Sequence, residues 1–300
     1  MDWTVYWFML PACVVIASVA MFSGISGAAL LTPLVLIGFP LLHAPRLTTV
    51  AAIGTALMLE TSGFGMGVCR YLRFRLVDIR TALFLIAATL PLGALGAIVA
   101  PRVPAHGLRL GYGVGMIVLA ALLASELRRS VRLSVETPGG PVPGDSPCPG
   151  ELREIIARTG ARYTYCARGL RGQRCISGVG AFLAGLISTG VGEATMPPLV
   201  GRSRFPIPVA AATSTVVVAG TVVGAASTHA VQLMLEDGFS AVPWNLVAWA
   251  VPGALIGATI GTRLQGRIDA QAAKLFFACL FLAIGVTFLL AFTVLVDRFG

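Results

Sequence analysis

The hydrophobic residues of this chain fall in long runs, separated by short segments that carry most of its charged residues. A helix that crosses a membrane needs roughly 20 mostly apolar residues. The runs are continuous, whereas barrel strands alternate apolar with polar residues, and helices satisfy their own backbone hydrogen bonds in lipid. The pattern predicts an all-α polytopic membrane protein with about eight transmembrane helices. The runs cover residues 3–22, 47–69, 79–99, 108–127, 176–187, 209–230, 244–261 and 272–296.

A polar segment divides these runs into two halves of four. Residues 128–174 are rich in arginine, and residues 137–150 read TPGGPVPGDSPCPG, a composition that cannot form a packed core. We therefore predict a first membrane repeat at residues 1–127, a linker at 128–174 and a second membrane repeat at 175–300.

The two halves share four landmarks in the same order, which indicates an internal repeat. Many transporter folds are built from such repeats, with the substrate site at the interface between them. The landmarks of the first half are Gly24-Ile-Ser-Gly27 with Pro33-Leu34, Ala52-Ile-Gly-Thr55, Pro91-Leu-Gly-Ala-Leu-Gly96 and Pro101-Arg102. Those of the second half are Gly190-Val-Gly192-Glu193 with Pro197-Pro198-Leu199, Ala211-Ala-Thr213-Ser214, Pro252-Gly-Ala-Leu-Ile-Gly257 and Thr262-Arg263.

Composition identifies lipid as the main surroundings of the chain. Hydrophobic residues make up 56% and charged residues only 12%, with a mean hydropathy of +0.86, whereas a soluble domain has about a quarter charged residues. The net charge of +9 comes almost wholly from arginines in the loops, where the positive-inside rule and anionic lipid headgroups account for them. No arginine or lysine stripe is interleaved with aromatic residues, so we exclude nucleic-acid binding.

The linker is the most basic loop, which places it in the cytoplasm by the positive-inside rule. An even number of spans in each half makes the two halves point the same way and puts both termini in the cytoplasm too. This parity changes if an interrupted segment does not span. We expect a multi-pass integral protein of the plasma or inner membrane.

The most informative feature is a pair of interrupted segments at matching places in the two halves. Glycine lets the backbone approach closely, and proline is suited to the start of a helix. The half-helix after each break would present free N–H groups and a positive dipole end, an arrangement that binds anions. Close packing of helices through small residues is the alternative. The candidate substrate-binding residues are Gly24, Ser26, Gly27 and Pro33 in the first half, and Gly190, Gly192 and Pro197 in the second.

Hydroxyl groups follow both breaks and could hydrogen-bond an oxyanion. Thr55 in the first half matches Thr213 in the second, and Ser214 follows it. Each of these groups could equally bond its own helix backbone. We include all three among the candidate substrate-binding residues.

Two carboxylates, Glu60 and Glu193, lie within hydrophobic runs. A carboxylate at bilayer depth is costly and usually faces a cavity or a partner. Both are candidates for carrying a proton together with the substrate. For Glu60 the alternative is a helix-end residue near the arginines at 70, 73 and 75, and for Glu193 it is a structural ion pair with Arg202 or Arg204.

Enzyme, metal and cofactor chemistry have little support in the sequence. The six cysteines form no CxxC pair and are interpreted as free thiols. The chain has no GxSxG, HExxH, P-loop or strand-linked GxGxxG motif. We expect no enzyme activity, no metal and no cofactor, and transport driven by an ion gradient or by a channel-like path.

These residues resemble the sulfite exporter TauE/SafE family of membrane permeases. The resemblance rests on SGISGAALLTPLVLIGFP with AAIGTAL in the first half, and on STGVGEATMPPLV with PVAAATSTVV in the second. It covers nearly the whole chain except the linker. This chain departs from the family pattern by a thinner glycine cluster and by the glutamate in the second motif. The resemblance implies a secondary transporter for sulfite, a sulfonate or a related organic anion.

A second reading belongs to another class of function. The chain could be a membrane assembly or maturation factor that does not transport and that docks a partner through the arginine-rich linker. The interrupted segments and the buried carboxylates favour the transporter. The sequence leaves the oligomeric state open, a homo-oligomer included.

Overall fold

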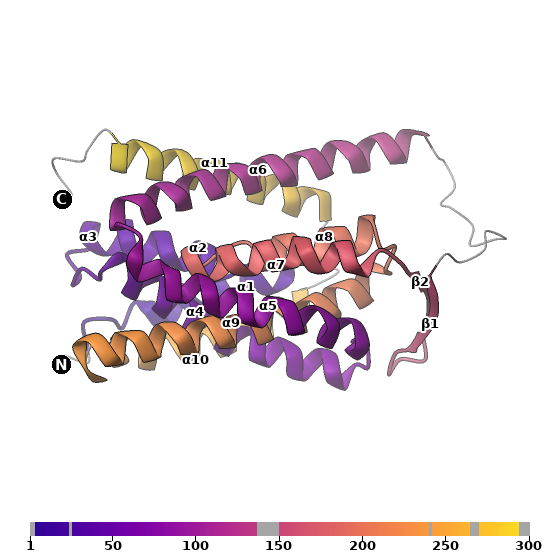
Figure 1. Cartoon of the computed structure of the whole chain (residues 1–300), viewed down its shortest axis with the longest axis horizontal. Coiled ribbons are helices and arrows are strands. Elements are labelled where there is room, and N and C mark those ends of the chain that lie inside the picture. Colours follow the sequence, from indigo (N-terminus) through magenta and orange to yellow (C-terminus); the bar gives the residue numbers. More distant parts are fainter. Residues whose placement is uncertain (1–3, 24–25, 137–149, 240–241, 265–269, 294–300) are drawn as a thin grey trace.

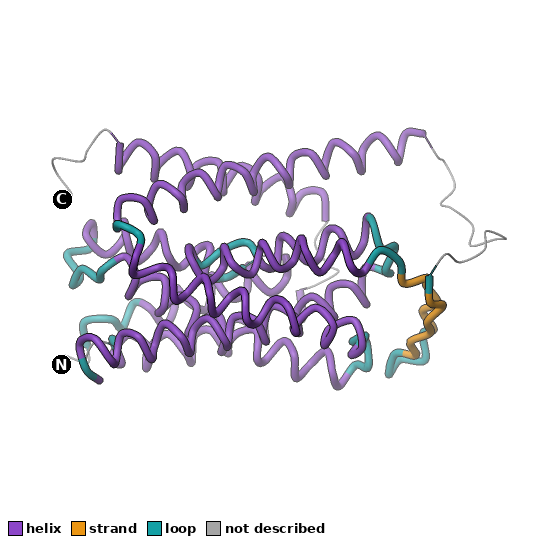
Figure 2. The backbone as a smooth tube through the Cα atoms, viewed as in Figure 1, coloured by secondary structure: helices purple, strands orange, loops and turns teal. Residues whose placement is uncertain are grey.

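The computed structural model describes residues 4–23, 26–136, 150–239, 242–264 and 270–293. A bundle of helices makes up nearly all of this part, and one two-stranded hairpin projects from an end of the bundle (Figures 1 and 2). The first half contains α1 (Met9–Ser23), α2 (Ala28–Pro33), the π-helical turn η1 (Leu34–Gly38), α3 (Phe39–Leu41), α4 (Thr49–Arg73), α5 (Ile79–Val99), the 3-10 turn η2 (Ala100–Arg102) and α6 (Ala105–Glu136). Next come β1 (Glu151–Ile156) and β2 (Arg162–Ala167). The second half contains α7 (Leu170–Ile187), α8 (Val191–Gly201), α9 (Ile207–Asp237), α10 (Trp244–Leu264) and α11 (Ala270–Thr293).

The predicted all-α polytopic membrane class is confirmed. Within the described ranges, five helices are long and apolar enough to cross a membrane, namely α4, α5 with η2, α6, α9 and α10. Shorter apolar helices are α1, the run from α2 to α3, and α11. The exact count of eight is not confirmed, and residues 28–41 and 191–201 form helices outside the eight predicted runs.

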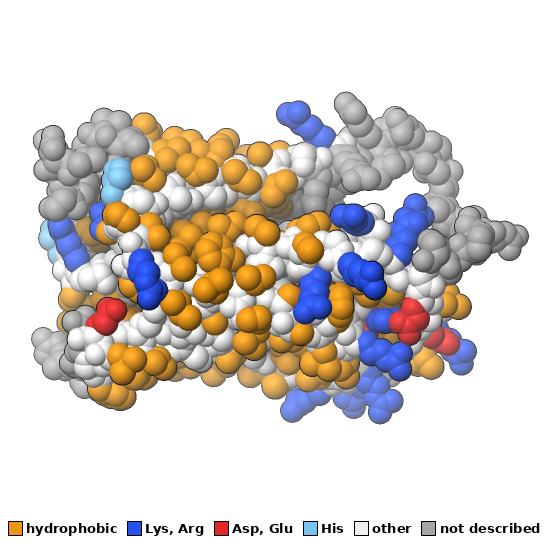
Figure 3. All heavy atoms as spheres, in the orientation of Figure 1, with side chains coloured by type: hydrophobic (Ala, Val, Ile, Leu, Met, Phe, Trp, Pro, Cys, Tyr) orange, Lys and Arg blue, Asp and Glu red, His pale blue; other side chains and the backbone are white. Residues whose placement is uncertain are grey.

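Large hydrophobic side chains are exposed on the outer faces of the helices, as expected for contact with lipid. Leu83 on α5, Leu122 on α6 and Val179 on α7 are each more than half exposed. Figure 3 shows hydrophobic side chains along the middle of the bundle and arginine or lysine mostly toward its ends.

The helix α4 of the first half and its counterpart α9 of the second run in opposite directions. The end of the bundle that carries the hairpin is called the hairpin end. There the N–H of Asp78, just before α5, donates to Thr213 Oγ1 near the start of α9 at 3.0 Å. The N–H of Arg158 in the hairpin donates to the carbonyl of Phe74 after α4 at 3.0 Å. The hairpin end therefore holds the end of α4 and the starts of α5 and α9.

The opposite end holds the start of α4 and the end of α9. Arg109 near the start of α6 donates to Thr49 at the start of α4 at 3.0 Å. Ala51, Leu233 and Val242 form one apolar cluster there, from the start of α4, the late part of α9 and the residues before α10. The two halves are thus an inverted repeat, in which corresponding helices run in opposite directions.

Small residues create two equivalent close helix contacts between the two halves. Gly253 and Gly261 on α10 lie against Leu10 and Ser18 on α1, so these helices run parallel with their backbones touching. In the equivalent contact, glycines of α5 pack against α7 in the same way, with Gly96 against the backbone of Phe182. Close approach through small residues is the usual way in which helices associate in lipid.

The expectation that both termini share one side of the membrane with the linker is wrong for this fold. Helix α1 starts at the end opposite the hairpin, because it runs parallel to α10. Helix α11 ends there too, since Phe288 stacks on Tyr112 near the start of α6 at 4.8 Å (Figure 1). Each interrupted segment turns back as a separate helix, so each half has five helical segments instead of four and the parity changes.

The arginine-rich segment between the halves contains a folded hairpin that the sequence did not predict. Strands β1 and β2 pair antiparallel, from Glu151 with Ala167 to Ile156 with Arg162. Tyr165 of β2 packs on Phe205 before α9 with ring centroids 4.5 Å apart. Helix α6 also continues to Glu136, past the end of its apolar run. Residues 137–149, which include Cys148, lie outside the described residues.

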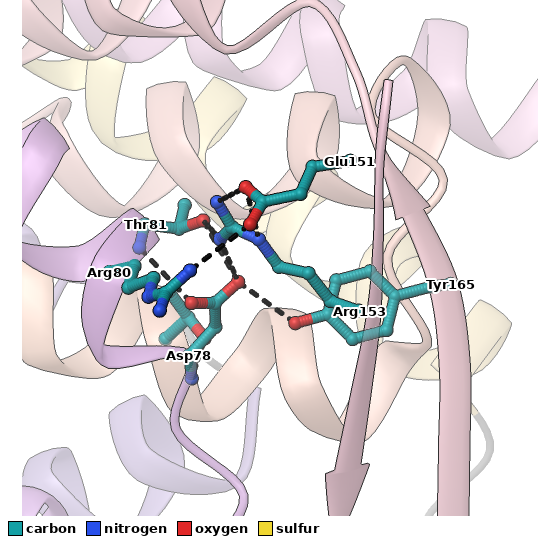
Figure 4. Close-up of polar contacts among 7 residues, drawn as sticks. Asp78, Arg80, Thr81, Glu151, Arg153 and Tyr165 are labelled. Atoms are coloured by element: carbon teal, nitrogen blue, oxygen red, sulfur yellow. Dashed lines mark hydrogen bonds and ion pairs between the residues drawn. The ribbon is translucent and has the colours of Figure 1, made fainter. Parts of the chain in front are cut away.

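A buried acid attaches this hairpin to the bundle. We call Asp78, Thr81, Glu151, Arg153 and Tyr165 the hairpin cluster (Figure 4). Asp78 accepts hydrogen bonds from Arg153 at 2.7 Å, from Tyr165 at 2.8 Å, and from the backbone and hydroxyl of Thr81 at 3.1 and 2.9 Å. Arg153 also pairs with Glu151 at 2.6 Å. Burial alone would raise the pKa of Asp78, but the bonds from Thr81, Arg153 and Tyr165 outweigh it and lower that pKa.

Candidate functional site

The structure brings the two interrupted segments into direct contact. The break between α1 and α2 faces the break between α7 and α8. The hydroxyl groups of Thr32 on α2 and Ser188 at the end of α7 lie 2.6 Å apart. Ser188 has a left-handed backbone (φ 59°) and Gly190 follows with φ 119°, so the chain reverses sharply before α8 begins.

Ser26 in the first break joins the two carboxylates predicted from the sequence. Its hydroxyl donates to Glu60 Oε1 on α4 at 2.6 Å, and its backbone N–H donates to Glu193 Oε1 on α8 at 3.1 Å. We call Ser26, Glu60 and Glu193 the interior cluster. Ser26 is 1% exposed and Glu60 is 4% exposed.

The interior cluster has uncompensated acid groups. Glu60 Oε2 and Glu193 Oε2 are buried and have no hydrogen-bond partner in the described part of the chain. The ion pairs among described residues all lie at the hairpin and involve neither glutamate. A buried acid without a cation is costly at bilayer depth, which makes this cluster the candidate functional site.

The two carboxylates occupy the helix N-termini that the sequence assigned to an anion. Glu60 faces the backbone N–H groups of Gly27 and Ala28 at the start of α2. Glu193 lies in the first turn of α8 and faces its own N–H and that of Gly190. The free N–H groups and positive dipole ends of both helices are therefore met by acids of the protein itself.

The structural alternatives for both glutamates are contradicted. Glu60 lies in the interior of α4 and not at its arginine-bearing end. Arg202 follows α8 at its other end, where its guanidinium group lies against Gly172 near the start of α7. Arg204 makes no ion pair with Glu193 within the described residues.

A small cavity of about 20 Å³ adjoins Glu60. That volume is enough for roughly one water molecule. Its walls come from α1, α2, α4 and α10, and Glu60 is the one carboxyl group among otherwise apolar side chains and a thiol. The lining includes Cys13, Gly27, Glu60, Phe64 and Ala254.

The predicted glycines and prolines have different places from those expected. Gly24 lies outside the described residues. A Cβ at Gly27 would lie 3.5 Å from Ala20, an ordinary contact, so the close approach expected there is absent. Gly192 is buried in the first turn of α8.

The sequence predicted that Pro33 and Pro197 start their helices, and this prediction is wrong. Helices α2 and α8 begin earlier, at Ala28 and Val191. Proline inside a helix removes a backbone hydrogen bond. After Pro33 the chain forms the π-helical turn Leu34–Gly38, which accommodates that loss.

The predicted hydroxyls do not gather at the breaks. Thr213 accepts the Asp78 N–H at the hairpin end, and Ser214 donates to the carbonyl of Ala211 in its own helix at 3.0 Å. Thr55 lies in the part of α4 toward the opposite end, and its buried hydroxyl has no partner among the described residues. Antiparallel α4 and α9 separate the matched threonines.

Tyr112 is a residue near the cluster that sequence reasoning missed. Its hydroxyl donates to the carbonyl of Ala29 at 2.5 Å, which ties α6 to the start of α2. A tyrosine in a long apolar run gives no sign of its partner. Cys166 is disulfide-bonded, which corrects the interpretation of all cysteines as free thiols, whereas Cys13 and Cys175 are free. No group of three metal-ligating side chains occurs among the described residues.

Comparison with known proteins agrees with this architecture. The sequence model of the sulfite exporter TauE/SafE family matches residues 9–288, which covers both halves and the breaks. The chain belongs to the sulfite exporter TauE/SafE family.

A curated relative of this TauE/SafE chain comes from Bacillus subtilis (strain 168). It is described as probable membrane transporter protein YunE, and it is 23% identical over 238 residues, 79% of this chain and 80% of the relative. No solved structure matches this chain. The family and the relative identify an integral multi-pass membrane transporter.

Proposed function

We propose that this TauE/SafE chain is a secondary transporter that moves a small anion such as sulfite, a sulfonate or a related organic anion together with a proton. The observation that carries the proposal is the bridge by Ser26 between Glu60 and Glu193, where the two interrupted segments meet. Substrate and ion sites of transporters usually lie where such segments meet at a repeat interface.

Charge balance supports proton binding at the interior cluster. Two ionised carboxylates that are bridged by one serine repel each other strongly where water is excluded. No ion pair offsets either charge among the described residues. A proton shared by the pair removes this repulsion, and the two acids then titrate as one coupled unit.

Competition for backbone N–H groups supplies the coupling. Glu60 and Glu193 face the first N–H groups of α2 and α8 when no substrate is bound. An anionic substrate would bind the same N–H groups once protonation weakens the hold of a carboxylate. Proton and anion therefore favour each other's binding, and the result is symport.

The test is flux in proteoliposomes that contain the purified protein. Sulfite, sulfate, thiosulfate and small sulfonates are offered while internal pH is recorded. In Glu193→Gln the amide mimics the protonated acid, so substrate exchange should continue and pH-driven accumulation should disappear. Glu154→Gln is the control, because Glu154 is exposed on the hairpin, and both activities should persist in it.

Intact pH-driven accumulation by Glu193→Gln would rule out the proton-carrier role. No flux of any offered anion in the native protein would contradict the anion assignment. The alternative of a non-transporting assembly factor also predicts no flux. It has no specific support in the described part of the linker, because the hairpin packs on helices of its own chain.

We propose that the hairpin end faces the cytoplasm and that the start of α1 and the end of α11 face the other side. Exposed arginines of the hairpin and of neighbouring helix ends gather there, as the positive-inside rule requires. The disulfide of Cys166 on its own favours an oxidising side, but orientation follows the arginine bias.

Labelling with an impermeant thiol reagent tests this orientation in a variant whose native cysteines are serine. Thr159→Cys in the hairpin turn should be protected in intact cells, and His106→Cys at the start of α6 should react. Both positions are exposed. The reverse pattern would overturn the proposed orientation and place the disulfide on the outer side.

A further inference from the structure

A basic cavity lies between the hairpin turn and the end of α4, away from the interior cluster. Its volume is about 540 Å³ and it is open to the surface. Arg73 is in the last turn of α4, Arg75 follows that helix, and Arg158 comes from the hairpin turn. Ile156, Ala157 and Gly160 complete the lining, which contains no acidic residue.

The hairpin holds these arginines in place around the cavity. The Arg158 N–H donates to the Phe74 carbonyl at 3.0 Å and so fixes the turn against the end of α4. Arg75 has a left-handed backbone with φ 55°, a conformation that is unfavourable for a residue other than glycine. The chain thus has an arginine at a position where glycine would adopt the backbone conformation at a lower energetic cost.

None of the three arginines is neutralised within the described part of the chain. Ion pairs there join Arg80 and Arg153 to Glu151, Arg153 to Asp78, and Arg162 to Glu154. The acids of the hairpin are therefore engaged elsewhere. The helix dipole accounts for a cation at the end of α4, but not for three that converge from two separate segments.

Exposed apolar side chains indicate the nature of the ligand: Ile156 lines the cavity, and Leu72 and Phe74 adjoin its arginines in the sequence. Leu72, Phe74 and Ile156 are 47%, 41% and 51% exposed. The 25 residues of α4 exceed the length needed to cross the hydrocarbon core, so its last turn reaches the headgroup level. Arginine beside exposed leucine and phenylalanine suits a molecule with a phosphate group and an acyl chain.

We propose that Arg73, Arg75 and Arg158 bind the phosphate of an anionic phospholipid headgroup, with Leu72 and Phe74 against its acyl chain. The site clamps the hairpin to the membrane surface. It does not depend on the identity of the transported anion, so failure of one proposal leaves the other intact.

Native mass spectrometry of the purified full-length protein tests the site. Phosphatidylglycerol, phosphatidylcholine and soluble glycerol phosphate are titrated separately. Phosphatidylglycerol should bind more tightly than the other two. Arg158→Gln should weaken that binding about fivefold, and the triple variant Arg73→Gln/Arg75→Gln/Arg158→Gln on the order of a hundredfold. Arg102→Gln at the opposite end is the control and should bind like the native protein.

Three outcomes would overturn the proposal. One is equal binding of phosphatidylglycerol and phosphatidylcholine by the native protein, and another is unchanged phosphatidylglycerol binding by the triple variant. The third is saturation by glycerol phosphate at the same concentration, which would assign the site to a free phosphate compound. Because Arg158 lies outside the bundle, the single variant keeps the helices folded and remains informative if the triple variant does not.

Discussion

Two groups of buried acids in this protein have opposite surroundings. In the hairpin cluster, Asp78 meets a guanidinium group, a phenol and a helix N-terminus, and both of its oxygens are bonded. In the interior cluster, Glu60 and Glu193 share one serine, lack a cation, and each keeps an oxygen without a partner among the described residues. The first arrangement stabilises a charge, and the second leaves its charge open to change.

This difference separates a structural acid from one suited to transport. A buried carboxylate with an arginine and several donors stays ionised and holds two segments together. The charge of a buried carboxyl pair without a cation changes when the pair gains or loses a proton, and the two groups titrate as a coupled unit. Whether a buried carboxylate has a cation and hydrogen-bond donors around it is thus more informative about its role than its burial alone.

The largest effect should come from Arg153→Gln in the hairpin cluster. Asp78 would remain buried without its cation, and breaking such a pair costs about 3 kcal/mol. The released hairpin should be cut by trypsin at its remaining arginines roughly two orders of magnitude faster. Arg162→Gln is the matched control on the same hairpin, because its ion pair is exposed and long at 3.8 Å. Equal cleavage of the two variants would show that Arg153 does not hold the hairpin.

Low pH should weaken the contact between Asp78 and the hairpin, to a smaller extent than Arg153→Gln does. The pKa of Asp78 is lower in the folded protein than in the unfolded chain. Its stabilisation is therefore complete above the ordinary aspartate value of about 3.9 and is lost as pH falls through the folded value. A dye on Thr159→Cys should lose anisotropy over that range. The added change Asp78→Asn should remove the transition, and a transition that persists would assign it to another group.

The smallest effect on stability should come from Glu60→Gln in the interior cluster. The amide keeps an acceptor for the Ser26 hydroxyl and removes an uncompensated acid. The free energy of unfolding should change by less than about 1 kcal/mol and should not fall. Thermal melting in detergent beside Arg153→Gln measures the contrast between the two clusters. A loss as large as that of Arg153→Gln would make Glu60 a structural acid.

The membrane class and the two intramembrane acids could be predicted from the sequence. The length and continuity of the hydrophobic runs depend on composition alone, so the helices could be predicted. Glu60 and Glu193 stood out because charges are rare in such runs. Ser26 was among the candidates, but its place between the two acids depends on how α2, α4 and α8 pack. No local pattern contains that information.

The relative direction of the two halves and the presence of the hairpin could not be predicted, for two physical reasons. Residues 28–41 and 191–201 are short and contain proline, so they read as breaks in a span and not as returning helices, and the parity was miscounted. Residues 151–167 are rich in arginine, which suggested a solvated linker. Their strands are stabilised by contacts with Asp78 and Phe205, which lie in other parts of the chain.

The inverted repeat also implies a second conformation of the molecule. Because the halves share one design in opposite directions, exchange of their backbone arrangements would produce a second state, with the crossing point of the breaks fixed. The two states would not have equal energy. In the aligned landmarks, Gly27 stands where Glu193 does, and no acidic residue of the second half stands at the position of Glu60. In the proposed proton-coupled transport, proton binding at this unsymmetrical pair would shift the balance between the two states.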